Sequence, residues 1–257
     1  GTVDYNHLET LLKSDTKKLV SLMHINNEVG NILDIKRVGD LCKANNALFH
    51  TDTVQSVGHY HLDLQNINID FLAASAHKFH GPKGVGFCFI RAASGLKPLI
   101  FGGEQERGYR AGTESLHNIV GMDEALNIAY LNLEVESKYI KSLKRYFIDS
   151  LNEKLSNCHF NGKSGDIEKS TYTLINVCLP LPREKAAMLQ FQLDLKGIAC
   201  SKGSACQSGS NMASHVLSAF LPEDRLKRPS VRFSLSKYNT KAEIDYVVDT
   251  LCEFAEN

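Results

Sequence analysis

Short apolar segments typical of strands alternate, in the first half of the sequence, with segments whose apolar residues recur at helical spacing. One helical segment covers residues 4–14 and another follows Asp34. The strand-like segments are residues 18–25, 47–50, 71–74 and 84–90. Strands separated by helices predict βαβ units and a mainly parallel sheet, and hence an α/β fold.

The pattern changes after a long helical segment at residues 115–151, which we expect to be broken once. Beyond it, residues 171–177 are predicted to form a half-exposed strand. The remaining strands are predicted at 197–200 and 231–235, and the remaining helices at 185–194 and 241–254. This half of the chain therefore predicts a smaller α+β module. We place the boundary near residue 132, so that the two domains are residues 1–132 and 133–257.

The composition excludes several classes of protein. The 257 residues contain 29 Lys and Arg against 29 Asp and Glu, so the basic excess of a nucleic-acid-binding protein is absent. The apolar runs are too short to span a bilayer, and the first residues lack a signal-peptide pattern. The seven Cys show neither a CxxC pair nor the spacing of a disulfide framework, which favours reduced thiols and a cytoplasmic location. No metal-ligand motif is found, so we expect no metal site.

Polar side chains follow three of the predicted strands at the point where each strand ends. Asn26 and Asn27 follow the first strand, Asp52 the second, and residues 75–78 the third. In a parallel sheet such positions meet at the carboxyl edge, where ligands bind. We therefore expect a small-molecule site at this edge.

Lys78 lies at a strand end, close to Ser75 and His77 and just before a Gly-Pro turn. A lysine that forms a Schiff base needs partial burial and neighbouring polar or cationic groups that lower its pKa. The segment is compatible with that role. The alternative is a solvated lysine in a turn, which is the commoner role of an isolated lysine.

Asp52 and Gln55 lie in the segment His-Thr-Asp-Thr-Val-Gln, at the end of the second predicted strand. Pyridoxal phosphate requires a carboxylate against its ring nitrogen, so that the ring can act as an electron sink. Asp52 can supply that carboxylate, and Gln55 can donate to the phenolate oxygen of the ring. The alternative for Asp52 is a helix N-cap, which is common at such a position.

Together these segments resemble those of the cysteine desulfurases, pyridoxal-phosphate enzymes of the class V aminotransferase family with fold type I. The resemblance covers nearly the whole chain, and the matching segments keep the family's order and approximate spacing. They are MHINNEVG (23–30), HTDTVQSVG (50–58), SAHKFHGPKGVG (75–86), GGEQERGYRAGT (102–113), SKGSACQSGS (201–210) and SVRFSLSKY (230–238).

The resemblance implies how the cofactor, pyridoxal 5'-phosphate, is held. Lys78 would form the Schiff base, Asp52 would pair with the ring nitrogen, and Gln55 would reach the phenolic oxygen. Ser75 and His77 would bind the phosphate.

Other residues are implied to contact the substrate or a second subunit. Asn27 would lie near the substrate and the phenolic oxygen, and Arg232 would clamp the substrate carboxylate by a bidentate contact. Thr113 would reach the cofactor phosphate of a neighbouring subunit, which makes a homodimer the expected form.

Cys206 carries the sulfur chemistry in this interpretation. Small residues surround it in Gly-Ser-Ala-Cys-Gln-Ser-Gly-Ser (203–210), as expected of a loop whose thiolate takes up sulfur as a persulfide. The alternative is a structural loop cysteine that oxidises readily. Cys200 is a second candidate, although its apolar neighbours favour burial. Three further cysteines are predicted to lie in the core: Cys42, Cys88 and Cys252.

The activity implied by the resemblance is removal of sulfur from L-cysteine, which gives L-alanine and an enzyme persulfide for iron–sulfur cluster assembly or tRNA thiolation. The expected partners are L-cysteine, a second copy of the chain and a sulfur-acceptor protein such as an iron–sulfur scaffold. Members of the family extend further on the N-terminal side. Their Gly/Thr phosphate-binding turn and ring-stacking His have no counterpart in residues 1–22, so we expect part of the large domain to lie outside this sequence.

Two alternatives stay open. One is another pyridoxal-phosphate activity, such as that of a selenocysteine lyase or an aminotransferase. The other is a non-catalytic fragment or dimerisation partner, which retains Lys78 but does not hold the cofactor.

Overall fold

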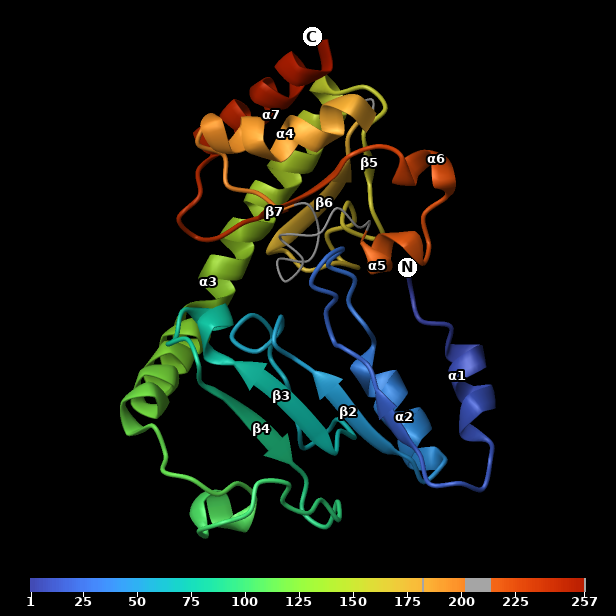
Figure 1. Cartoon of the computed structure of the whole chain (residues 1–257), viewed down its shortest axis with the longest axis vertical. Coiled ribbons are helices and arrows are strands. Elements are labelled where there is room, and N and C mark those ends of the chain that lie inside the picture. The colour runs from blue at the N-terminus through green and yellow to red at the C-terminus, as the bar shows by residue number, and fades with distance from the viewer. Residues whose placement is uncertain (182, 202–213, 257) are drawn as a thin grey trace. The chain divides into compact units, whose positions relative to one another are not determined.

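The computed structural model describes residues 1–181, 183–201 and 214–256, which form two compact units (Figure 1). The N-terminal unit consists of Asp4–His24 and Leu33–Leu133. The C-terminal unit consists of Gly1–Val3, Ile25–Ile32 and Glu134–Asn257. The segment Ile25–Ile32 thus belongs with residues that follow it by more than a hundred positions.

A four-stranded sheet forms the centre of the N-terminal unit. Its strands lie in the order β1 (Leu19–Ser21), β2 (Leu48–Asp52), β3 (Phe71–Ser75) and β4 (Gly86–Ile90). β1 pairs with β2, and β2 with β3, in parallel. β3 and β4 are antiparallel, because the short connection between them leaves no room for a crossover helix. The predicted α/β fold with a mainly parallel sheet is confirmed.

Two helices of this unit begin at aspartates, namely α1 (Tyr5–Leu12) and α2 (Ile35–Ala44). The Asp34 carboxylate accepts a hydrogen bond from the Arg37 backbone N–H at 2.9 Å. This bond satisfies a donor that has no partner within the first turn of α2. The helix predicted after Asp34 is therefore confirmed, and it packs against β2.

Helix α3 (Leu116–Lys154) spans 39 residues, and the division between the two units falls inside it, after Leu133. It contains no proline, and its one glycine, Gly121, lies near its start. A Cβ atom at Gly121 would lie 2.8 Å from Cγ of Pro82. The glycine therefore permits close packing of the helix on the Gly-Pro turn that follows Lys78.

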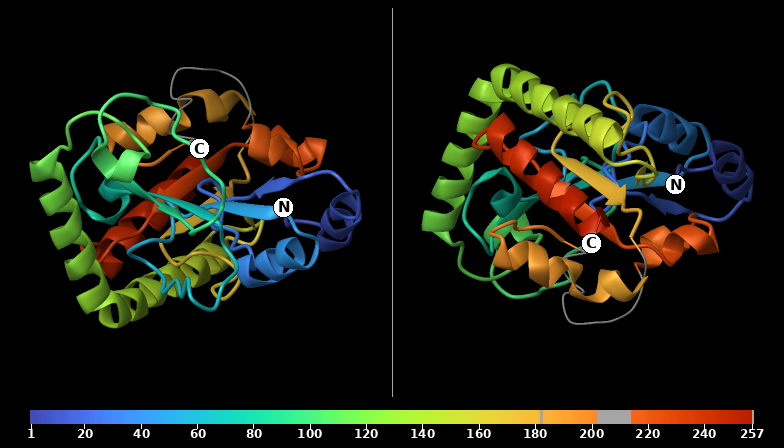
Figure 2. Two further views of the ribbon diagram at one scale, coloured as in Figure 1. Left: turned by 90° about the horizontal axis from the view of Figure 1, so that it is seen from below. Right: turned by 90° about the horizontal axis from the view of Figure 1, so that it is seen from above.

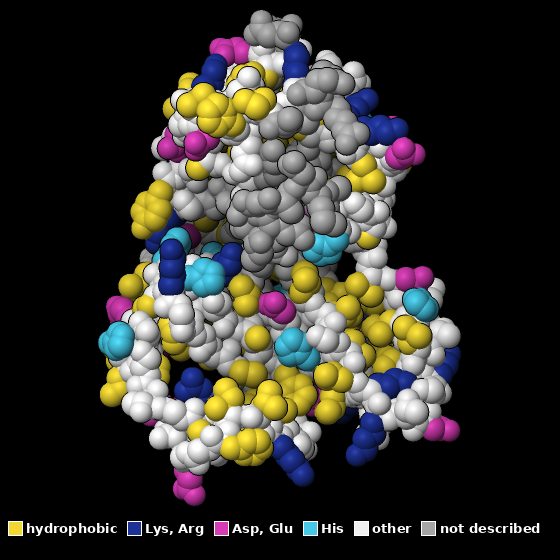
Figure 3. All heavy atoms as spheres, viewed as in Figure 1, with side chains coloured by type: hydrophobic (Ala, Val, Ile, Leu, Met, Phe, Trp, Pro, Cys, Tyr) yellow, Lys and Arg dark blue, Asp and Glu magenta, His cyan; other side chains and the backbone are white. Residues whose placement is uncertain are grey.

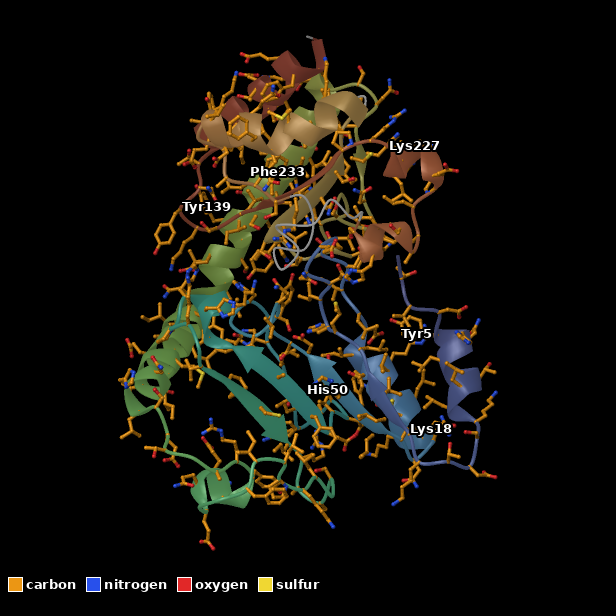
Figure 4. All side chains as sticks on the ribbon, in the orientation of Figure 1. Tyr5, Lys18, His50, Tyr139, Lys227 and Phe233 are labelled. Carbon is orange, nitrogen blue, oxygen red and sulfur yellow. The ribbon has the colours of Figure 1, made fainter. Side chains whose placement is uncertain are left out.

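The C-terminal unit contains an antiparallel sheet in the order β5 (His159–Phe160), β6 (Leu174–Cys178) and β7 (Ser230–Ser234). Every residue of β6 is buried, so the prediction of a half-exposed strand is wrong. On the Ile175 side, its β7 neighbour Phe233, which is labelled in Figure 4, packs on Phe147 of α3, and the two ring centroids are 5.2 Å apart. On the Asn176 side, the segment Ile25–Ile32 covers the strand through a hydrogen bond from Asn176 Nδ2 to the Glu28 carbonyl oxygen.

The remaining helices of this unit are α4 (Arg183–Leu195), α5 (His215–Ser218), α6 (Glu223–Leu226) and α7 (Lys241–Glu256). Helix α7 runs beside the later part of α3 (Figure 2). Tyr146 Oη of α3 donates a hydrogen bond to Asp245 Oδ1 of α7 at 2.6 Å. The two long helices predicted in this half of the chain, at 185–194 and 241–254, are confirmed.

No strand forms at residues 197–200, which corrects another prediction. Gly197 has φ +76°, and the Ile198 N–H donates to the Leu193 carbonyl oxygen at 2.9 Å. The chain therefore caps the end of α4 instead of extending. Of the described residues between 197 and 201, Ser201 alone pairs with the sheet, through an isolated bridge to Arg232.

None of the cysteines that the structure describes forms a disulfide. Cys42 is buried in the core, as predicted, and Cys252 is half-buried. Cys88 is exposed, which contradicts its predicted place in the core, because it lies on a face of β4 that this chain does not cover. Hydrophobic side chains also reach the surface (Figure 3), and they include Leu99 and Phe101, which are 89% and 80% exposed.

Candidate active site

The carboxyl ends of β1, β2 and β3 lie at one edge of the N-terminal sheet, because the three strands are parallel. Backbone hydrogen bonds continue past the strand ends. The His24 N–H donates to the Asp52 carbonyl oxygen at 2.9 Å, and the Thr53 N–H donates to the Ala73 carbonyl oxygen at 3.0 Å. Ser75 ends β3. His24, Asp52 and Ser75 therefore occupy the same edge.

Asp52 is exposed at the end of β2, where its Oδ1 accepts a hydrogen bond from the Val54 N–H at 2.8 Å. The residues that follow form turns and no α-helix, so Asp52 orders a turn and is not a helix N-cap. Among the described residues, this hydrogen bond to the Val54 N–H uses only the Oδ1 atom of Asp52. The second carboxylate oxygen can therefore accept an N–H from a ligand at this edge.

The turn η1 (Ala76–Phe79) follows β3 and sets the direction of the next side chains. Ala76 and Phe79 are buried, whereas His77 and Lys78 are exposed. Ser75 Oγ lies 2.8 Å from His77 Nδ1. The partial burial expected for Lys78 is therefore not provided by the residues that the structure describes, because η1 turns this side chain outward.

The turn that carries Gln55 packs against the turn that carries Lys78. Gly58 has φ +79°, and a Cβ atom there would lie 2.6 Å from Cβ of Phe79. In addition, His59 Nε2 lies 3.1 Å from the carbonyl oxygen of Lys78. The half-buried Gln55 and the exposed Lys78 thus lie on adjoining segments.

Sequence reasoning missed His24. This residue is 7% exposed, and its Nδ1 has no hydrogen-bond partner. Its ring lies edge-on to Tyr60, with centroids 6.2 Å apart. Burial lowers the pKa of His24 to about 4, so the imidazole is neutral at pH 7. Its position between the first strand and Asn26 is the signal that could have found it.

Arg232 and Asn27 lie together in the C-terminal unit. Arg232 Nη1 donates to the Asn27 carbonyl oxygen at 2.6 Å, and Nη2 donates to Ser201 Oγ at 3.4 Å. The buried Nε has no hydrogen-bond partner. None of the ion pairs within the described part of the chain includes Arg232. The guanidinium can therefore receive an anion.

Burial lowers the pKa of the Arg232 guanidinium, and the negative charge of Glu28 opposes that shift. Glu28 was also missed in the sequence. It is 1% exposed, and its carboxylate accepts a hydrogen bond from Ser214 Oγ. In the sequence, the position of Glu28 next to Asn27 in the segment MHINNEVG is the feature that could have pointed to it.

The other predicted residues are less constrained by the structure. Thr113 is exposed in the N-terminal unit. Cys206 lies outside the described residues. Cys200 is half-buried, and burial raises the pKa of its thiol to about 11. Cys200 is therefore almost entirely protonated at pH 7, which disfavours it as a nucleophile.

Within the described ranges, no three or more His, Cys, Asp or Glu side chains are grouped so that they could hold a metal ion. None of the helices in the described part of the chain has both the length and the apolar character needed to cross a membrane.

The fold defines a class of protein, the α/β proteins of fold type I, to which the NifS-like structures belong. Residues 1–247 match the family model described as Aminotransferase class-V. The chain belongs to this family.

Two curated relatives carry the name cysteine desulfurase IscS. That of Dictyoglomus turgidum is 39% identical over 251 residues, which cover 98% of this chain and 62% of the relative. That of Salmonella paratyphi B is 37% identical over 251 residues, which cover 97% of this chain and 60% of the relative. The chain thus spans about 60% of the length of these relatives.

Solved structures agree with this family. A NifS-like protein is 35% identical, with a TM-score of 0.85 over 99% of this chain and 65% of its own. A NifS-like protein from Rickettsia africae is 30% identical, with a TM-score of 0.87 over 100% of this chain and 68% of its own. Both are similar to this chain in fold and sequence.

Proposed function

We propose that this chain provides the substrate- and cofactor-binding residues of a cysteine desulfurase, which removes sulfur from L-cysteine and leaves L-alanine. The observation that carries the proposal is the joint position of Asp52, Gln55 and Lys78 on adjoining segments at the carboxyl edge of the sheet. Identity of 37–39% with proteins named cysteine desulfurase IscS supports the choice of reaction.

The residues at this edge fit pyridoxal phosphate by their chemistry. Lys78 offers an exposed amine for the aldehyde, and Asp52 offers a carboxylate oxygen for the protonated ring nitrogen. Ser75 and His77, which lie within hydrogen-bond distance of each other, offer donors for the phosphate. Gln55 offers an amide donor for the phenolic oxygen. When bound, pyridoxal phosphate supplies the electron sink that stabilises negative charge at the substrate α-carbon.

Different residues of the chain would bind the substrate, transfer the proton and accept the sulfur. Arg232 would bind the substrate carboxylate through guanidinium donors that have no partner among the described residues, and Asn27 lies beside it. Lys78 would hold the cofactor until the substrate displaces it, and the amine released in this way would move the proton at the substrate α-carbon. The Cys206 thiolate would attack the substrate sulfur and form a persulfide as the Cβ–S bond of the substrate breaks, with the electron pair of that bond retained by the carbon skeleton that becomes L-alanine. A sulfur-acceptor protein such as an iron–sulfur scaffold would then receive the outer sulfur.

The proposal also includes the domain organisation, the oligomeric state and the cellular location of the enzyme. Residues 1–132 would belong to the C-terminal part of a large domain and residues 133–257 to a small domain, with Ile25–Ile32 of the first range packed in the same unit as the small domain. A homodimer would bring Thr113 to the cofactor phosphate of the neighbouring subunit. The protein would act in the cytoplasm, with its persulfide used in iron–sulfur cluster assembly or tRNA thiolation.

The exposure of Lys78 favours a second candidate, in which the chain retains the lysine but does not hold the cofactor. An absorbance spectrum of the purified protein with pyridoxal phosphate separates the two. We expect a visible band that borohydride removes, and a mass increase confined to the Lys78 peptide. Lys78→Ala should lose the band, whereas Lys83→Ala, an exposed lysine of the same segment, should keep it.

Product analysis then tests the reaction. L-alanine together with a protein persulfide supports a desulfurase. Alanine formed from selenocysteine alone would indicate a selenocysteine lyase, and a keto acid would indicate an aminotransferase. Absence of the band in the unmodified protein would overturn the catalytic proposal.

A further inference from the structure

Glu28 is a buried carboxylate in the C-terminal unit whose position is set by its neighbours. Its backbone N–H donates to Asn26 Oδ1 at 2.9 Å, and its carbonyl oxygen accepts from Asn176 Nδ2 at 2.8 Å. Asn176 is itself 1% exposed and lies on the central strand β6. The Glu28 side chain therefore extends from a backbone that is held in place on both sides.

The charge of Glu28 acts on Arg232 without forming an ion pair. None of the ion pairs among the described residues includes Glu28. Even so, the negative charge of Glu28 opposes the lowering of the Arg232 pKa that burial causes. The Asn27 carbonyl oxygen that Arg232 binds at 2.6 Å belongs to the residue just before Glu28. A buried negative charge thus lies close to a guanidinium whose Nε has no hydrogen-bond partner in the described part of the chain.

The orientation of Arg232 depends on other groups. Its backbone exchanges two hydrogen bonds with Ser201, at 3.1 and 2.7 Å, and its side chain is held by the Asn27 carbonyl oxygen and by Ser201 Oγ. The Glu28 carboxylate instead accepts from Ser214 Oγ, which also accepts from the Leu217 N–H at the start of α5. Removal of the Glu28 charge should therefore leave the guanidinium where it is.

We propose that Glu28 weakens, by like-charge repulsion, the binding of a carboxylate to Arg232. The proposal rests on the proposed function, in which Arg232 receives the carboxylate of L-cysteine and of L-alanine. A carboxylate that binds Arg232 meets the negative charge of Glu28 in poorly solvated surroundings, where charges interact more strongly than in water. The repulsion limits affinity for the product as well as for the substrate, and so favours release of L-alanine.

Substitutions can separate the charge of Glu28 from its hydrogen bond. Glu28→Gln removes the charge and keeps an oxygen that accepts from Ser214. Ser214→Ala removes the hydrogen bond and keeps the charge. Glu153→Gln removes a negative charge from an exposed position of the same unit and serves as the matched control.

The measurement is isothermal titration of the protein with propionate and with L-alanine, together with KM and kcat for L-cysteine. Glu28→Gln should bind both ligands about fivefold more tightly and should lower KM by a similar factor. Ser214→Ala and Glu153→Gln should leave the dissociation constants unchanged. A purely structural role for Glu28 predicts weaker binding, and an unchanged or weaker dissociation constant in Glu28→Gln would overturn the proposal.

Two further variants keep the result interpretable. Glu28→Leu removes the charge with a different shape and should tighten propionate binding in the same direction if Glu28→Gln does not fold. Arg232→Lys should abolish most of the binding in every background. Propionate binding that requires Arg232 but is indifferent to Glu28 would sink this inference alone. Tighter binding in Glu28→Gln, in a protein that shows no pyridoxal band, would support the inference and sink the proposed function.

Discussion

A Cβ atom at Gly58 would lie 2.6 Å from Cβ of Phe79, so the turn that carries Gln55 and the turn that carries Lys78 meet where only glycine fits. Gly58 also has φ +79°, a backbone conformation that side chains with a Cβ atom rarely adopt. This contact holds two segments of the candidate site together. It can be tested without any assumption about the reaction.

Gly58→Ala should lower the free energy of unfolding by about 2–4 kcal/mol, because backbone strain and a steric clash add together. Gly95→Ala is the matched control, since Gly95 has φ +77° and no atom within 4 Å of its Cβ position. That control should cost only the strain, about 1 kcal/mol. Urea denaturation of the three proteins measures the difference. Equal losses in the two variants would show that the contact with Phe79 is not tight.

Asp52→Asn should retain the fold and lose activity. The amide oxygen can still accept the Val54 N–H, so the turn after β2 should form and the melting temperature should change little. The amide cannot hold a ring nitrogen in its protonated state, so kcat should fall by about 10²-fold or more. Desulfurase assays and thermal unfolding test both halves. Activity within a few-fold of the unmodified protein would remove Asp52 from the site.

Cys206→Ala should abolish sulfur release from L-cysteine while the visible absorbance of the cofactor stays. Cys200→Ala should remain active, because burial raises the pKa of the Cys200 thiol to about 11 and leaves little thiolate at pH 7. Sulfide formation and persulfide labelling of each variant provide the readout. Turnover that survives in Cys206→Ala and disappears in Cys200→Ala would transfer the nucleophile to Cys200.

Lys144 should make stability depend on pH in the alkaline range. This side chain is fully buried and donates from Nζ to Ser170 Oγ at 2.6 Å and to the Thr171 carbonyl oxygen at 2.7 Å. Burial lowers its pKa from 10.5 to about 8. Between these two values the unfolded chain binds more protons than the folded one, so the free energy of unfolding rises with pH.

The rise attributable to Lys144 should reach about 1–3 kcal/mol between pH 8 and pH 10.5. Urea denaturation of the unmodified protein and of Lys144→Met at several pH values isolates it, because other groups titrate in both proteins. Lys138→Met, at an exposed position of the same helix, should behave like the unmodified protein. Parallel pH profiles for the unmodified protein and Lys144→Met would contradict the prediction.

Much of the fold follows from local patterns. The Asp34 cap, the apolar strand segments and the alternation of strands with helices predict the N-terminal sheet, because each depends on residues close together in the chain. The prediction fails where burial is decided by distant segments. Residues 171–177 alternate like a half-exposed strand, yet β6 is buried throughout, because α3 lies on one side and Ile25–Ile32 on the other.

The sequence alone determined that polar residues such as Asp52 and Lys78 would follow strands, since strand ends are set by local apolar runs. Tertiary structure decided which of these side chains are covered, and it turned Lys78 outward through η1. It also decided that Glu28 meets Ser214, 186 positions away, and that Arg232 meets Asn27 across 205 positions. Such contacts depend on how the sheet pairs and how the helices pack, and no local pattern in the chain encodes them.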